Sequence, residues 1–124
     1  MDKILTFADR QTFREWLGKY GTESEGIWLL FSKKGEFVTL SSGDALEEAL
    51  CHGWIDGQIQ SLDDNTYKKY FARRIPKSKW SVKNKELAQT LMEKGLMTQQ
   101  GLEATERARK NGLWDNAKRT LIDD

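Results

Sequence analysis

The sequence predicts an α+β fold, in which a small, mainly antiparallel sheet of three to five strands packs with about four helices. Apolar residues recur at helical spacing in four segments, each ending close to a glycine. The run from Gly26 to Ser32 is almost continuously apolar, and two aromatic or β-branched segments flank a turn at residues 63–65. In chain order the expected elements are (β)αββαββαα.

Length and composition indicate one soluble domain. The chain has 124 residues, of which 38% are hydrophobic and 31% charged. We expect a domain over residues 1–114 and a frayed tail over residues 115–124, where the apolar pattern fades. The single cysteine excludes an internal disulfide and leaves too few ligands for a cysteine-based zinc site, so we expect neither a metal nor another cofactor. The first residues lack the apolar stretch of a secretory signal, and we therefore expect a cytoplasmic protein without membrane insertion.

The first helix is expected between Asp9, which can cap its N-terminus, and Gly21, which can adopt the left-handed conformation of a C-cap. A short apolar run from Ile4 to Phe7 precedes it as an edge strand or lead-in. The apolar side chains of this helix follow the spacing of a helix that lies on a core; they are Phe13, Trp16, Leu17 and Tyr20.

A buried strand and a second helix follow. The run at residues 26–32 is too short for a buried helix and fits a strand covered on both faces. Residues 37–39 can pair back as a brief strand. A capped helix is expected over Ser41–His52, with Glu47 and Glu48 turned away from its apolar face.

Two strands joined by a tight turn are expected at Ile55–Leu62 and Tyr67–Arg74. If the turn is tight, the numbers of facing residues sum to about 129. This register would place Asp56 opposite Arg73.

Two more helices complete the predicted domain. They are expected over Ser81–Lys94 and Thr98–Lys110, each beginning at a capping hydroxyl. Glu103 and Arg107 stand four residues apart, in the order that favours an ion pair on a helix surface. Trp114 can fold back as an anchor after the last helix.

Charge is unevenly distributed along the chain. Residues 1–64 carry 6 Lys/Arg and 12 Asp/Glu, whereas residues 65–124 carry 14 and 7. Between Thr66 and Lys85 there are eight basic residues and no acidic one. This asymmetry can mark an anion-binding face, or it can mean that the two halves pack together and neutralise each other.

Three blocks of the sequence resemble the YdeI/OmpD-associated family, called bacteriocin-protection proteins in bacteria. The blocks are Glu47 to Gln58, Phe71 to Asn84, and Gly95 to Leu102 with the later Gly112-Leu113-Trp114. The resemblance covers about residues 4–114. It implies an uncharacterised bacterial protein linked to bacteriocin tolerance or envelope stress, and supplies no catalytic residues. Many members continue into a basic helical C-terminal segment, so the resemblance implies the family's N-terminal domain.

The strongest candidate for function is a binding site around the corner at residues 53–57. Asp56 lies between two glycines, where the backbone can approach a ligand closely. The alternative for Asp56 is a cross-strand ion pair with Arg73. The predicted ligand-binding residues, which require both tryptophans to line one cleft, are Trp54, Asp56, Gln58, Arg73, Arg74, Lys79 and Trp80.

The sequence therefore favours a non-enzymatic binding domain for a small anionic ligand or a protein partner. One alternative is binding of nucleic acid or a phosphorylated ligand through residues 66–85, where basic and aromatic side chains alternate, although no nucleic-acid motif is present. Another is an enzyme that uses Asp56 or His52 as general base. Cys51 and His52 are adjacent on a helix and diverge, which argues against a thiol nucleophile activated by this histidine.

Overall fold

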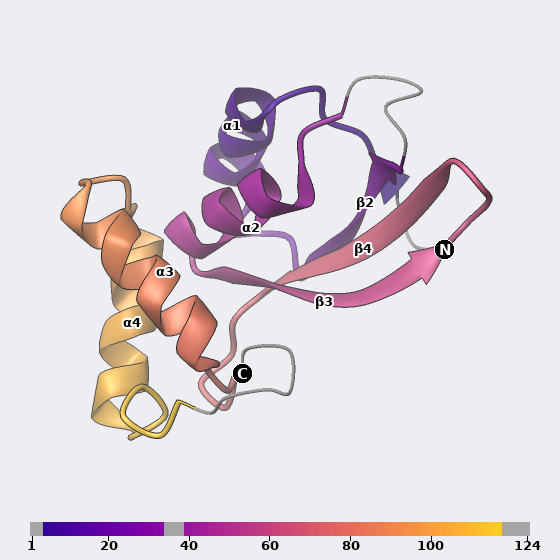
Figure 1. Ribbon diagram of the computed structural model, residues 1–124. Helices are drawn as coiled ribbons and strands as arrows, with labels where there is room; N and C mark the ends of the chain where they lie inside the picture. Colours follow the sequence, from indigo (N-terminus) through magenta and orange to yellow (C-terminus); the bar gives the residue numbers. More distant parts are fainter. Residues whose placement is uncertain (1–3, 34–38, 118–124) are drawn as a thin grey trace.

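The computed structural model describes residues 4–33 and 39–117, and its elements follow the predicted order in an α+β fold (Figure 1). Within these residues, four strands form one sheet and four helices pack with it. The elements are β1 (Ile4–Leu5), α1 (Arg10–Tyr20), β2 (Gly26–Ser32), α2 (Ser42–Cys51), β3 (Trp54–Ser61), β4 (Thr66–Arg73), α3 (Val82–Glu93) and α4 (Gln99–Lys110). Residues 37 and 38 of the predicted strand at 37–39 and most of the predicted tail lie outside the described residues.

The sheet is mainly antiparallel, as predicted. Its strand order is β1-β2-β4-β3, with β4 antiparallel to both of its neighbours and β1 parallel to β2. Helices α1 and α2 lie on one face of the sheet (Figure 1). Helices α3 and α4 form a pair at one end of the sheet, where both contact α2.

The helix starts are confirmed in detail, because each predicted capping side chain accepts a hydrogen bond from a backbone N–H in the first turn; these residues are Asp9, Ser41, Ser81 and Thr98. The predicted left-handed conformation of Gly21 is wrong, since its φ is −65°. A glycine is needed there for another reason: a Cβ would overlap the Leu17 carbonyl oxygen, to which the Gly21 N–H donates.

The register of the β3–β4 hairpin differs from the prediction. Asp56 faces Phe71, and Arg73 faces Trp54. Between Asp56 and Ile59, β3 carries one residue more than β4, which is a β-bulge. The bulge and a wider turn shift the partner of Asp56 by two positions, so the predicted Asp56–Arg73 pair does not form.

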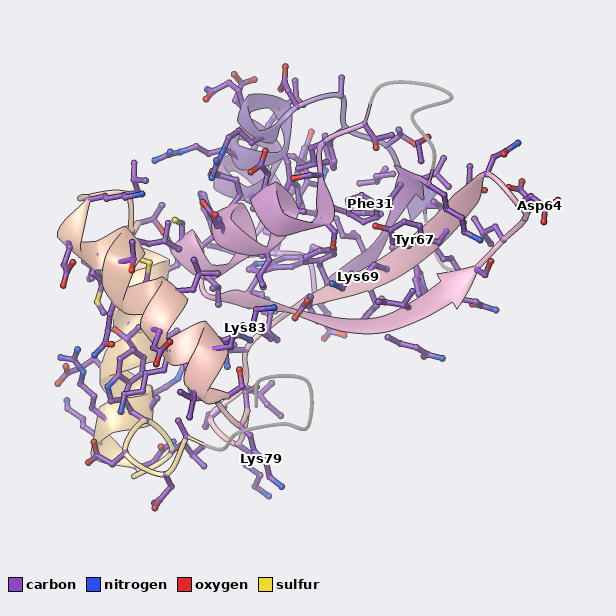
Figure 2. All side chains as sticks on the ribbon, in the orientation of Figure 1. Phe31, Asp64, Tyr67, Lys69, Lys79 and Lys83 are labelled. Atoms are coloured by element: carbon purple, nitrogen blue, oxygen red, sulfur yellow. The ribbon has the colours of Figure 1, made fainter. Side chains whose placement is uncertain are left out.

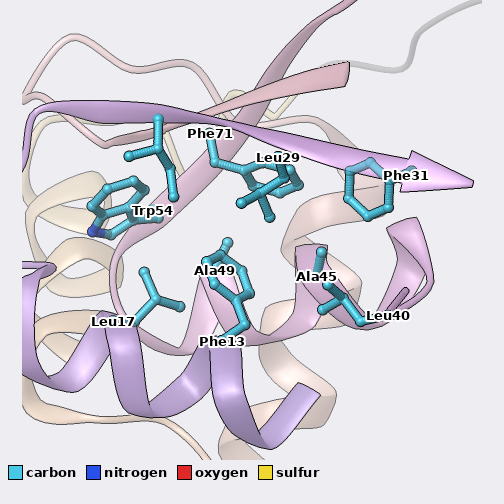
Figure 3. Packing of buried hydrophobic residues seen from close by; sticks show 10 residues of the cluster. Phe13, Leu17, Leu29, Phe31, Leu40, Ala45, Ala49, Trp54 and Phe71 are labelled. Atoms are coloured by element: carbon cyan, nitrogen blue, oxygen red, sulfur yellow. The ribbon is translucent and has the colours of Figure 1, made fainter. Parts of the chain in front are cut away.

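A first hydrophobic cluster, the sheet core, fills the space between the sheet and helices α1 and α2 (Figure 3). Trp54 and Phe71 from the strands and Phe13 from α1 are completely buried. The Phe13 and Phe71 rings meet edge to face, with centres 5.9 Å apart. The members are Phe13, Leu17, Ile27, Leu29, Phe31, Leu40, Ala45, Ala49, Trp54 and Phe71.

A second cluster, the helix core, joins α2 to α3 and α4. Trp80 and Trp114 pack edge to face in it, with ring centres 5.0 Å apart, which confirms Trp114 as an anchor. Because α2 supplies residues to both clusters, it connects the two parts of the molecule. The members of the helix core are Leu46, Leu50, Cys51, Trp80, Ala88, Leu91, Ala108 and Trp114.

Glu48 is buried, contrary to the prediction that it faces outward. Its Oε2 accepts a hydrogen bond of 2.8 Å from Arg10 Nε, and its Oε1 lies 3.9 Å from Arg14 Nη1. Helix α1 lies across this side of α2, so a position exposed on an isolated helix is covered here. The two arginines supply the charge that a buried carboxylate requires.

Candidate functional site

Arg74 is the first residue after β4, and its side chain turns back into the protein. The residue is 6% exposed. Its guanidinium carbon lies 3.5 Å from the centre of the Trp80 ring, and its Nη1 donates a hydrogen bond of 3.1 Å to the Lys79 carbonyl oxygen. The loop of residues 75–80 therefore wraps around a buried positive charge.

The other edge of this guanidinium is unpaired. Among the described residues, Arg74 Nε and Nη2 have no hydrogen-bond partner, and both atoms are buried. These two N–H groups point in parallel, the arrangement that binds two oxygens of a carboxylate or phosphate. Burial lowers the pKa of Arg74 to about 10, with Asp56 acting in the opposite direction, so the group is still charged at neutral pH. A buried donor pair of this kind is stabilised by an anionic partner.

Arg74 lines a cleft of about 270 Å³ between the end of the sheet and α4. We name it the arginine cleft because Arg73 and Arg107 also line it. Both residues are exposed. Each donates a hydrogen bond to a backbone carbonyl oxygen: Arg73 Nε to Ser24 O at 2.8 Å, and Arg107 Nη2 to Arg74 O at 3.5 Å. The lining residues are Gly21, Thr22, Gly53, Arg73, Arg74, Gln100, Glu103 and Arg107.

The backbone at Gly53 brings α4 up to the sheet. Gly53 has φ +78°, and a Cβ there would stand 2.8 Å from the Gln100 carbonyl oxygen. Next to it, the N–H and Oγ1 of Thr98 donate to the Cys51 carbonyl oxygen at 2.9 and 2.6 Å. The first turn of α4, where the helix dipole is positive, is thereby held beside the arginines.

The cleft carries an excess of positive charge, with three arginines against one carboxylate, Glu103. The predicted ion pair between Glu103 and Arg107 does not form, since Arg107 turns towards the Arg74 carbonyl. Glu103 instead accepts a hydrogen bond of 3.2 Å from Gln99 Nε2. The cleft therefore offers anion-binding donors from the end of β4 and from α4, together with one acceptor on α4.

Of the predicted site residues, Arg73 and Arg74 line the cleft directly. Trp54 does not reach it, because the ring is completely buried in the sheet core. Its indole Nε1 donates to the Gly21 carbonyl oxygen at 3.1 Å and so supports the wall of the cleft from inside. Trp80 is buried beneath Arg74 and likewise acts as support. The condition that both tryptophans line one cleft is therefore not met.

The remaining predicted residues lie elsewhere. Asp56 Oδ2 forms an ion pair of 2.8 Å with Lys69 Nζ, which also donates to Ser42 Oγ at the start of α2 (Figure 2). Gln58 is exposed at the β-bulge. Lys79 supplies its carbonyl oxygen to Arg74, but its own side chain points outward at the edge of the molecule (Figure 2).

His52 and Cys51, two of the residues considered for catalysis, are enclosed by the protein. His52 is buried, with Nδ1 3.0 Å from the Glu48 carbonyl oxygen, and burial lowers its pKa. Burial, together with Glu48, raises the pKa of Cys51 to about 11, so its thiol is protonated at neutral pH and is a poor nucleophile. Within residues 4–33 and 39–117, no group of three or more His, Cys, Asp or Glu side chains could hold a metal ion.

The aromatic side chains of residues 66–85 are either buried or packed against another ring. Phe71 and Trp80 are buried, Tyr67 stacks on Phe31 at 5.2 Å between ring centres, and Tyr70 packs against Trp28. Base stacking needs free ring faces. The packing of these rings does not favour the nucleic-acid alternative.

Sequence reasoning missed Arg107, Gln100 and Thr22, which come from two distant segments. The helical spacing of the sequence contained a signal for Arg107. The residue stands three positions after Ala104, which is buried, so the two side chains are neighbours on the surface of α4. Its assignment to a surface ion pair hid this position.

One family model, described as "Domain of unknown function (DUF8412)", matches residues 5–104. The chain belongs to this family. The DUF8412 match includes Arg73, Arg74, Gln100 and Glu103 of the arginine cleft and ends before Arg107. No curated protein and no solved structure matches the chain. In the described part of the chain, no helix has the length and apolar character required to cross a membrane.

Proposed function

We propose that the protein is a binding domain for a small anionic ligand, which is held in the arginine cleft. The observation that carries the proposal is the buried Arg74 guanidinium, whose parallel Nε and Nη2 donors are unpaired among the described residues. Arg73 and Arg107 line the same cleft, so an anion bound there would be surrounded by three guanidinium groups once the covered Nε and Nη2 of Arg74 become accessible. Charge-assisted hydrogen bonds from arginine to carboxylate or phosphate are among the strongest available to a protein.

The chemistry of the cleft supports binding rather than catalysis. Guanidinium groups position and neutralise an anion, but at neutral pH they do not exchange protons. Asp56 and His52, the residues of the enzyme alternative, do not line the cleft, and each has a partner inside the protein. No observation therefore favours the alternative of a general base acting on a bound substrate.

A biological setting is proposed on resemblance alone. The three sequence blocks support a relationship between DUF8412 and the YdeI/OmpD-associated proteins, and with it a role in bacteriocin tolerance or envelope stress. A bacterium lacking the gene should then lose tolerance, and the intact chain should restore it. Failure of the intact chain to restore tolerance would end this part of the proposal, while leaving the anion site open to direct tests.

The anion site can be tested by NMR titration of isotope-labelled protein with inorganic phosphate, at constant ionic strength maintained with chloride. We expect saturable shifts of the arginine Nε–H signals and of the Gly53 and Gln100 amides, which surround the cleft. Constant ionic strength removes the general screening effect that affects every exposed charge.

Two variants of α4 provide a matched comparison. Arg107→Gln removes a charge inside the cleft, whereas Arg109→Gln removes the same charge from an exposed position outside it. We expect Arg107→Gln to weaken phosphate binding by about tenfold, because a charge-assisted hydrogen bond is lost, and Arg109→Gln to leave it nearly unchanged. Equal weakening in both variants, or no saturable shifts in the intact protein, would contradict the proposal.

A further inference from the structure

We infer that the ligand of the arginine cleft is a phosphorylated polyhydroxy compound, of the class of sugar phosphates. This inference rests on the proposed anion site and adds the identity of the ligand's two ends: a phosphate monoester at the arginines and hydroxyl groups at Glu103. Four properties of the cleft support it, namely its charge, its lining, its size and the position of Glu103.

The charge of the cleft fits a dianion. Three arginines and one glutamate leave two positive charges in excess. A phosphate monoester carries about −1.5 to −2 at pH 7, whereas a carboxylate carries one negative charge. The first turn of α4, which contains Gln100, adds the positive end of a helix dipole on the same side. A phosphate therefore neutralises the site more completely than a single carboxylate does.

The lining excludes a ligand with a large apolar part. The described residues around the cleft are glycine, threonine, glutamine, glutamate and arginine, without an aliphatic or aromatic side chain. Sites for nucleobases or lipids use apolar and aromatic walls. A volume of about 270 Å³ lies just below the usual range for drug-sized ligands, which is consistent with a small hydrophilic molecule.

Glu103 determines which end of the ligand lies near α4. Its carboxylate repels a phosphate and accepts hydrogen bonds from hydroxyl groups, and it is not neutralised by Arg107. Thr22 and Gln100 add polar groups to the same lining. A ligand with its phosphate at Arg73 and Arg74 would then direct its hydroxyl groups towards Glu103.

Entry to the Arg74 donors requires the atoms that cover them to move. Nε and Nη2 are covered, and Arg74 and Arg107 together line both the arginine cleft and a small adjoining cavity of about 10 Å³. Arg107 is exposed and held at its tip by one long hydrogen bond of 3.5 Å. On this inference, Arg107 rotates to admit the phosphate to Arg74 and then closes on it.

Isothermal titration calorimetry with four probes tests the inference: glucose 6-phosphate, inorganic phosphate, glucose and acetate, each at the same ionic strength. We expect glucose 6-phosphate to bind about tenfold more tightly than inorganic phosphate, because its hydroxyl groups add hydrogen bonds to a charged acceptor. Acetate should bind more weakly than phosphate, and glucose alone should give no measurable heat.

The Glu103→Gln variant makes the test specific, since the two phosphate probes should respond in opposite directions. Removing the carboxylate should weaken glucose 6-phosphate binding and slightly strengthen inorganic phosphate binding. Glu106→Gln, on the same helix and outside the cleft, should change neither. A circular-dichroism melt of each variant confirms that the fold is retained.

The outcomes separate this inference from the proposed function. Equal affinity for glucose 6-phosphate and inorganic phosphate, or no change with Glu103→Gln, overturns the inference and leaves the anion site intact. Tighter binding of acetate than of phosphate also overturns it. Binding of none of the anions overturns both. AMP as a fifth probe distinguishes a nucleotide ligand from a sugar phosphate. Tighter binding of AMP than of glucose 6-phosphate overturns the assignment to a polyhydroxy compound.

Discussion

The Trp80 ring has two partners: the Arg74 guanidinium carbon lies 3.5 Å from its centre, and the Trp114 ring packs edge to face with it, with ring centres 5.0 Å apart. A tryptophan face attracts a cation most strongly where water is excluded, and this ring is 4% exposed. Trp80 therefore holds Arg74 in place from below and belongs to the helix core at the same time. Its contribution to the proposed anion site is therefore indirect.

Replacing Trp80 by alanine should reduce the stability of the whole domain. The change removes a buried indole and its contact with Trp114, and we expect the free energy of unfolding to fall by about 3–5 kcal/mol. Urea denaturation followed by circular dichroism measures this loss. Ile75→Ala, a change at a 61% exposed position in the same loop, should alter stability by less than about 0.5 kcal/mol. A Trp80→Ala protein as stable as the parent would show that the ring is a surface group.

The buried thiol of Cys51 should make the stability of the domain depend on pH in the alkaline range. Burial raises the pKa of the folded thiol from 9.0 to about 11, so the unfolded chain loses this proton first as the pH rises. Between these values the unfolded state binds fewer protons than the folded state, and the stability contribution present below pH 9 is lost. We expect the free energy of unfolding to fall with pH across this window.

Tyrosines and lysines also titrate in this range, so the measurement is a comparison with Cys51→Ala. Urea denaturation at several pH values should give a steeper decline for the parent protein than for the variant. Parallel declines in the two proteins would show that the thiol has an ordinary pKa. The same burial should keep the native thiol unreactive towards alkylation at pH 8.

At single positions, the sequence pointed to two arginines that line the proposed site, and it misjudged the burial of the tryptophans. Arg73 and Arg74 stood out because they lie in a long run without acidic residues. Trp54 and Trp80 looked available because the strand pattern does not show which face another element covers. Burial of Glu48 was missed for the same reason, since the covering helix α1 is distant in sequence.

Individual elements were predicted well where their signals are local. Capping side chains act within one turn, and the caps at Asp9, Ser41 and Ser81 could therefore be predicted from the sequence. Strand register depends on the exact turn and on bulges. The extra residue between Asp56 and Ile59 is not visible in the apolar pattern, because this end of β3 is exposed on both faces.

Gly53 and Gly95 provide a test of how α4 is held against the sheet. Both have positive φ, so an alanine at either position costs about 1–2 kcal/mol of backbone strain. At Gly53 the new Cβ would also press on the Gln100 carbonyl oxygen, whereas at Gly95 it would meet no atom within 4 Å. We expect Gly53→Ala to lose a further 1–3 kcal/mol, roughly the cost of overpacking.

Thermal or urea unfolding of the two variants measures the difference. Gly53→Ala should also change the chemical shifts of the first turn of α4, because Gln100 must move away. Equal destabilisation by the two substitutions would mean that the close approach at Gly53 does not constrain α4.

Across the whole molecule, α2 connects two hydrophobic clusters. Its Ala45 and Ala49 belong to the sheet core, while Leu46, Leu50 and Cys51 belong to the helix core. The arginine cleft lies at the junction, with Arg73 and Arg74 from the end of the sheet and Arg107 from α4. A ligand in the cleft would thus contact both parts, and the geometry of the site depends on their remaining joined.

We therefore expect the domain to unfold as one cooperative unit. Leu50 is 2% exposed on the helix-core side of α2, and Leu50→Ala should cost about 2–5 kcal/mol. In native-state hydrogen exchange, this loss should lower the opening free energy of slowly exchanging amides in β2 and in α4 by the same amount, because both depend on α2. A loss confined to α3 and α4 would show that the helix pair opens separately. The arginine cleft would then come apart while the sheet core stayed folded, and ligand affinity would be reduced by the fraction of molecules in that open state.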